Sequence, residues 1–123
     1  MRPFERFAAG RAAHELTRVV YRASARWPLE ERYGLTAQAR RAAVSIGANL
    51  SEGAARQGAR ELRRYLDMAR GSHAELQYLL QVAGDLGYTT DEEREAVEEA
   101  VRKAGVLLWK LYSAVRTSAS TVR

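Results

Sequence analysis

A nearly uncharged stretch, residues 42–55, most constrains what this chain can fold into. The stretch reads AAVSIGANLSEGAA and has the composition of a helix, yet Glu52 is its sole charged residue. A helix on the surface of a lone bundle carries a charged outer face, and here small residues stand where charges belong. We therefore expect this helix to be buried on more than one side, with another copy of the chain as its partner.

The length of 123 residues fits one domain, residues 1–123, with a single core. Cysteine is absent, which excludes a disulfide framework and thiolate chemistry. No apolar run approaches the roughly 18 residues that span a bilayer. The first seven residues contain no continuous apolar signal region. These features predict a soluble, cytoplasmic protein that does not enter a membrane.

Apolar periodicity predicts four helices, at about residues 4–26, 36–57, 59–86 and 91–118. Thr36 is the expected N-cap of the second helix, and Gly87 is expected just after the end of the third. Thr90 and Glu93 have the spacing of a capping box at the start of the fourth. Long helices with short connections predict an all-α, antiparallel up-down-up-down four-helix bundle, which the uncharged stretch would assemble into a ring.

One face of the second predicted helix is polar. At 100° per residue, six side chains fall within an arc about 80° wide. A neighbouring sector carries only small or apolar residues apart from Arg40, namely Val44, Gly47, Ala48, Ser51 and Ala55. Buried polar groups are hydrogen-bonded to one another, so a structural network is the favoured interpretation of the polar face. Its members would be Arg41, Ser45, Asn49, Glu52, Arg56, Ser72 and Glu75.

Two alternatives to this network remain, a contact with a ligand or nucleic acid and, less favoured, catalysis. Within the network, Glu75 is placed to pair with Arg41 or Arg56. Gly71 interrupts the third predicted helix at a cost of about 1 kcal/mol relative to alanine. We expect that glycine to allow the close approach of a neighbouring backbone.

The charge of the chain is uneven. The net charge of +5 divides into +7 for residues 1–64 and −2 for residues 65–123, and arginine greatly outnumbers lysine. Arginine suits phosphate because its planar fork donates two parallel hydrogen bonds, although a GC-rich genome also favours arginine. The candidate nucleic-acid contact is an arginine patch made of Arg56, Arg60, Arg63 and Arg64. The alternative is an ordinary solvated helix end, partly neutralised by Glu61 and Asp67.

No catalytic constellation is evident. His14 and His73 lie on different predicted helices, and neither belongs to a Glu-x-x-His pair that would build a metal site. No phosphate-binding glycine loop or strand-to-helix nucleophile turn is present. Trp109 and Tyr112 are expected to pack at a helix contact. The sequence predicts a protein that is not an enzyme and has no cofactor, metal or small-molecule substrate.

The pattern between residues 38 and 76 resembles the four-helix bundle family named after the 23S rRNA intervening sequence. The matching residues are Gln38, Arg41, Ala42, Ser45, Ile46, Asn49, Leu50, Glu52, Gly53, Arg56, Glu61, Leu62, Tyr65, Leu66, Ala69, Gly71, Ser72, Glu75 and Leu76. Flanking segments at residues 27–35 and 86–88 also resemble this family. The resemblance implies a homopentamer, and a kinship with the retroelement accessory variability protein, a basic pentamer that binds a reverse transcriptase and nucleic acid.

These observations predict a non-enzymatic interaction or scaffold protein. The alternative is a nucleic-acid-binding accessory factor, with RNA or DNA backbone contacts and a reverse-transcriptase-type partner. Salt separates the two functions, since phosphate contacts weaken steeply with salt and apolar contacts do not.

Overall fold

The computed structural model describes the backbone of residues 1–122 and the side chains of residues 1–115. The fold is all-α, and residues 1–122 contain no strand. Its elements are η1 (Pro3–Arg6), α1 (Ala8–Ser24), η2 (Leu29–Glu31), α2 (Leu35–Ala55), α3 (Ala59–Asp85) and α4 (Asp91–Val122). Four helices close to the predicted positions therefore account for most of the chain, and η1 and η2 are short 3₁₀ turns beside α1 and α2.

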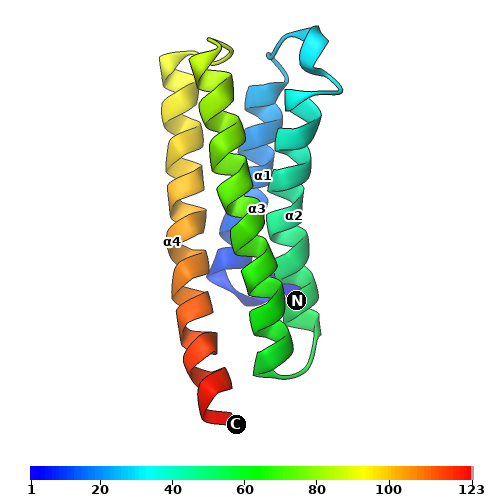
Figure 1. The fold of residues 1–123 in the computed structure, drawn as a ribbon, viewed down its shortest axis with the longest axis vertical. Helices are drawn as coiled ribbons and strands as arrows, with labels where there is room; N and C mark the ends of the chain where they lie inside the picture. The colour runs from blue at the N-terminus through cyan, green and yellow to red at the C-terminus, as the bar shows by residue number, and fades with distance from the viewer. Residues whose placement is uncertain (123) are drawn as a thin grey trace.

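The four helices lie side by side along the long axis of the molecule (Figure 1). Following the colours in Figure 1, α1 and α3 run in one direction and α2 and α4 return in the other. Each helix packs against two neighbours, because α1 and α3 both contact α2 and α4. The α2–α3 contact is the most extensive of these.

The core lies along the common axis of the helices. Its largest fully buried side chains come from all four helices: Leu16, Val20, Ile46, Leu50, Leu66, Leu76 and Leu108. Many other core positions are alanine, including Ala13, Ala39, Ala43, Ala69 and Ala83, each 0% exposed. Small side chains at these positions bring the helix backbones close together, so that the core is narrow.

The first predicted helix is divided in two by Phe7. The backbone at Phe7 is extended (φ −120°, ψ 145°), so α1 begins at Ala8 and residues 3–6 form η1. The chain folds back here until the Phe4 carbonyl lies where a side chain on Gly10 would be. The prediction of a single helix from Phe4 was therefore wrong, because a contact between η1 and α1 overrides the local helical preference.

The start of α2 also differs from the sequence-based expectation. Gly34, not Thr36, is the N-cap, and Thr36 is buried in the first turn. The Glu31 carboxylate, one turn earlier in η2, accepts a hydrogen bond from the Leu35 backbone N–H at 3.1 Å. A side chain outside the helix thus takes the capping role that Thr36 was expected to have.

The ends of α3 and α4 follow local rules. The N–H of Gly87, which has φ +76°, bonds to the Gly84 carbonyl, and the N–H of Tyr88 bonds to the Ala83 carbonyl. This pair of bonds is a Schellman motif with Gly87 just past the helix end, as predicted. The capping box is confirmed, since Thr90 and Glu93 exchange backbone-to-side-chain hydrogen bonds of 2.9 and 3.1 Å. The helix itself continues to Val122, beyond the predicted end at Ser118.

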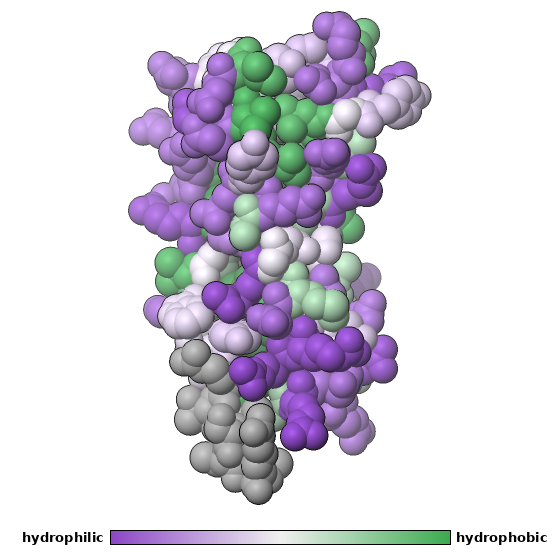
Figure 2. Space-filling model, viewed as in Figure 1, coloured by the Kyte–Doolittle hydropathy of each residue, from purple (hydrophilic) through white to green (hydrophobic). Residues whose placement is uncertain are grey.

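The face in Figure 2 is mostly hydrophilic, and hydrophobic side chains gather toward the end where α3 passes into α4. In the described part of the chain, no helix combines the length and apolar character needed to cross a bilayer.

Candidate functional site

The polar face of α2 is partly a hydrogen-bonded network. Ser45 Oγ on α2 lies 2.8 Å from Ser72 Oγ on α3. Asn49 Nδ2 donates to the Ser45 carbonyl at 2.9 Å and to Ser45 Oγ at 3.2 Å. The structure therefore brings together Ser45, Asn49 and Ser72, and this trio fixes the position of α2 along α3.

The charged members of the predicted network do not join this trio. Arg56, the residue just after α2, and Glu52, four residues earlier, form an exposed ion pair of 3.7 Å. Arg41 and Glu75 make no hydrogen bond or ion pair within the described residues, and both line a cavity of about 300 Å³ beside Ser45. The expected pairing of Glu75 with Arg41 or Arg56 is thus not made inside this chain.

Close approaches between helices occur at glycines other than Gly71. Gly71 is exposed, and a Cβ added there would meet no other described part of the chain within 4 Å, so the expected close backbone is not found among the described residues. A Cβ on Gly53 would lie 2.9 Å from Tyr65 Cβ, and one on Gly105 would lie 2.8 Å from the His73 ring. Glycines inside apolar helical runs could have predicted these close approaches, but the sequence does not show which of the glycines faces a neighbouring helix.

The arginine patch divides between two aromatic rings. The Arg56 and Arg64 guanidinium carbons lie 5.4 and 4.8 Å from the Tyr65 ring centre. Arg63 instead lies 5.9 Å from the ring of Tyr112 on α4. Arg60 is exposed and makes no hydrogen bond or ion pair in the described part of the chain. Three of the four arginines thus lie over aromatic rings, two over Tyr65 and one over Tyr112.

Arg64 is partly neutralised. Its guanidinium donates to both carboxylate oxygens of Glu61, at 3.4 and 3.3 Å. The hydrogen bond to Glu61 and the negative charge of that carboxylate raise the pKa of Arg64. Glu61 thus reduces the positive charge of the patch, as the solvated-end alternative expects.

An arginine–aromatic cluster on α3 and α4 was missed by sequence reasoning. The Arg70 guanidinium lies 5.0 Å from the Trp109 ring centre and 4.4 Å from that of Tyr112. Tyr112 is buried at the helix contact as expected, whereas Trp109 is 47% exposed. The sequence shows Arg70 on one predicted helix and the aromatic pair on another. It does not show that they lie at the same height, because packing sets the position of α3 along α4.

The uncharged side of α2 is open in the single chain. Val44 is 45% exposed, and Ala48 and Ala55 are also exposed. A shallow cavity of about 240 Å³ lies between this side and α1, and its walls include Thr17, Val44, Gly47 and Ala48. We call this surface the α1–α2 face. Phe4 of η1 lines one end of this cavity, and Val44 and Ala48 stay exposed.

A family model described as 23S rRNA-intervening sequence protein matches residues 5–110. The chain belongs to this family. The match includes all of the hydrogen-bonded trio, the arginine patch and the α1–α2 face. No curated protein matches the chain.

Each of the two histidines contacts another segment of the chain. The His14 ring packs 5.0 Å from the Phe4 ring, between centres, and His73 Nε2 lies 2.9 Å from the Val101 carbonyl oxygen. Among the described residues, no three His, Asp or Glu side chains gather in a group that would hold a metal ion.

Proposed function

We propose that this protein is a non-enzymatic, oligomeric scaffold, an antiparallel up-down-up-down bundle that assembles into a homopentameric ring. The observation that carries the proposal is the exposed α1–α2 face, where Val44 and Ala48 lie uncovered between two helices. The number of copies rests on the family resemblance.

The chemistry of the α1–α2 face supports a contact between copies. Its small residues let a second helix approach closely, and such an approach buries apolar area worth about 25 cal/mol per Å². A ring forms when this face meets a different surface of the next copy and the rotation closes. Arg41 and Glu75 are also available for ion pairs with a neighbouring copy, since neither has an ionic partner among the described residues.

The test is the solution mass by light scattering on a sizing column. We expect a mass near five times 13.8 kDa at both low and high salt. Ala48→Glu places a charge on the α1–α2 face and should yield monomers, whereas the control Ala96→Glu, at an exposed alanine of α4, should keep the wild-type mass. A monomeric wild-type protein would overturn the proposal.

The second candidate is a nucleic-acid-binding accessory factor that serves a reverse-transcriptase-type partner. The observation that favours it is Arg60, an exposed cation without an ionic partner in the described chain, beside Arg56 and Arg64. Repeated around a ring, these cations would contact phosphates with little sequence preference, and multiplicity would raise the avidity.

Fluorescence anisotropy with a labelled RNA at 50 and 200 mM salt tests this second candidate. A phosphate binder loses affinity steeply between the two salt concentrations. Arg60→Glu, Arg63→Glu and Arg64→Glu together should abolish binding without dissociating the assembly. The control exchanges Arg18, Arg22 and Arg102 for glutamate, which changes the net charge equally on other surfaces. Equal losses in both triple variants would show that the arginine patch is not the contact.

A further inference from the structure

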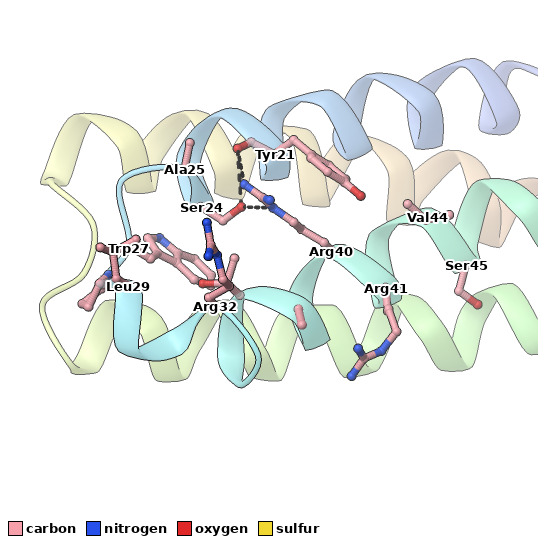
Figure 3. A pocket seen from close by; sticks show the side chains of 13 residues that line it. Tyr21, Ser24, Ala25, Trp27, Leu29, Arg32, Arg40, Arg41, Val44 and Ser45 are labelled. Atoms are coloured by element: carbon pink, nitrogen blue, oxygen red, sulfur yellow. Dashed lines mark hydrogen bonds between the residues drawn. The ribbon is translucent and has the colours of Figure 1, made fainter.

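A cavity of about 920 Å³ lies beside the connection between α1 and α2 (Figure 3). Its walls come from the end of α1, the turn that contains η2, and the first three turns of α2. Small-molecule sites commonly have volumes of about 300 to 1,000 Å³. The cavity is therefore large enough for a ligand of a few hundred daltons.

Arg40 is held in this cavity by neutral groups. Its Nε donates to Ser24 Oγ at 2.8 Å, and one terminal nitrogen donates to the Tyr21 carbonyl at 3.3 Å. The Tyr21 ring centre lies 4.5 Å from the guanidinium carbon. A guanidinium has five N–H donors, and these two bonds leave several for a ligand. Arg40 is thus fixed in place while its positive charge stays uncompensated.

Arg32 adds a second uncompensated charge. In Figure 3 its side chain and that of Arg40 both extend toward Ser24, whereas Arg41 points away toward α3. The Arg32 side chain makes no hydrogen bond or ion pair within the described residues, and no Asp or Glu is among the residues that line the cavity. Two guanidinium groups that line one cavity, with no carboxylate among its walls, are suited to bind a phosphate or carboxylate through paired hydrogen bonds.

The start of α2 adds little positive charge to the cavity. Thr36 and Ala37 line the cavity and belong to the first turn of α2. The Glu31 carboxylate accepts a hydrogen bond from the Leu35 backbone N–H of that turn and so offsets the partial positive charge of the helix start. The positive charge of the cavity therefore comes from its arginines.

Other parts of the wall are apolar. Tyr21 is 43% exposed and Leu29 is 79% exposed, and Pro28 and Val44 also line the cavity. A bare inorganic anion would leave these groups in contact with water. A ligand that has a flat or apolar body beside its anionic group would cover them as well.

We propose that this cavity binds a nucleoside monophosphate, with its phosphate on Arg32 and Arg40 and its base against Tyr21 and Leu29. The site is separate from the arginine patch, which lies where α2 passes into α3. It shares the wall residue Val44 with the α1–α2 face, and its proposed phosphate contacts, Arg32 and Arg40, do not line the cavity of that face.

The experiment is calorimetric titration of the intact protein with AMP, and with inorganic phosphate as the comparison. AMP should bind at least tenfold more tightly than phosphate. Arg32→Gln should weaken AMP binding at least tenfold without loss of folding, because Arg32 has no partner to lose within the described chain. The control Arg60→Gln, at an exposed arginine in the first turn of α3 that has no ionic partner among the described residues, should bind as the wild type does.

A fluorescence readout reports the location independently. The chain has two tryptophans, so Trp109→Phe leaves Trp27 at the cavity wall as the only one. AMP should then change the Trp27 emission of the Trp109→Phe protein, and it should not change that emission when Arg32→Gln is added to this protein. No AMP binding at 1 mM, or equal binding by Arg32→Gln, would overturn the proposal.

The same titration identifies the source of the phosphate. Equal affinity for AMP and for a 5′-phosphorylated trinucleotide assigns the site to a free nucleotide. Trinucleotide binding that is tenfold tighter and is lost in Arg32→Gln assigns it to the phosphorylated end of a strand. Equal binding of AMP and inorganic phosphate would show that the apolar walls take no part, and would contradict the proposal.

Discussion

At the scale of single residues, Gly10 of α1 lies so close to the backbone of η1 that no Cβ fits between them. A Cβ there would overlap the Phe4 carbonyl, so Gly10→Ala forces η1 away from α1. We expect a loss of about 1 to 2 kcal/mol in the free energy of unfolding, because overpacking outweighs the better helix propensity of alanine. Urea denaturation measures this loss.

Gly71→Ala is the matched control. Its Cβ would meet nothing within 4 Å, so the same exchange should stabilise the fold by about 1 kcal/mol through helix propensity alone. Equal effects of the two substitutions would contradict the close contact at Gly10.

A second prediction at this scale concerns the capping box of Thr90 and Glu93. The hydrogen bond from the Thr90 backbone N–H is the main cause that lowers the pKa of Glu93. A lowered pKa adds stability above the pKa of the unfolded chain, and that stability is lost as the pH falls through the folded value. Glu93→Gln should therefore flatten the acid side of the stability–pH profile. Glu95→Gln, in the same turn, should leave the profile as in the wild type.

At the scale of elements, the Ser45–Ser72 hydrogen bond joins α2 to α3. A hydrogen bond between neutral groups contributes about 1 kcal/mol. A double-mutant cycle with Ser45→Ala and Ser72→Ala should give a coupling energy of about 1 kcal/mol in chemical denaturation. Additive single effects would show that the two hydroxyls act independently, for example through Asn49 or solvent.

Helix ends that are set by hydrogen bonds between nearby residues could be predicted from the sequence. Features that depend on contacts between separate elements could not. Gly87 and the Thr90–Glu93 box set helix ends through bonds within six residues, and both were predicted. The break at Phe7 depends on the Phe4–Gly10 contact, which no local pattern contains.

The same distinction holds for the candidate site. Ser45 and Asn49 lie one turn apart on α2, and that helical spacing predicted their contact. Ser72 was expected in the same network from the third predicted helix, and it does contact Ser45. The pairing of Glu75 was not realised, and the role of Arg40 was missed, because both depend on which neighbouring helix a long side chain reaches. Arg40 extends to Ser24 and Tyr21 on α1.

At the scale of the whole molecule, η1 closes one end of the bundle. It packs against both α1 and α2, and Arg6 donates a hydrogen bond to the Ala54 carbonyl at 2.9 Å. Phe4 and Phe7 are half-buried, so removal of residues 2–7 should lower the free energy of unfolding by about 2 kcal/mol. Thermal and urea unfolding measure the change. Arg2→Ala, an exposed position in the same segment, is the control, and an unchanged midpoint in the truncated protein would refute this role.

The connection between α2 and α3 has a consequence for the order in which the chain folds. Only residues 56–58 link the two helices, Gly58 reverses the chain at φ +90°, and the pair shares the most extensive helix contact. Contacts close in sequence cost little loop-closure entropy and speed folding. We expect this helical hairpin to form while the chain is still leaving the ribosome, so that α4, synthesised last, docks onto a surface already in place.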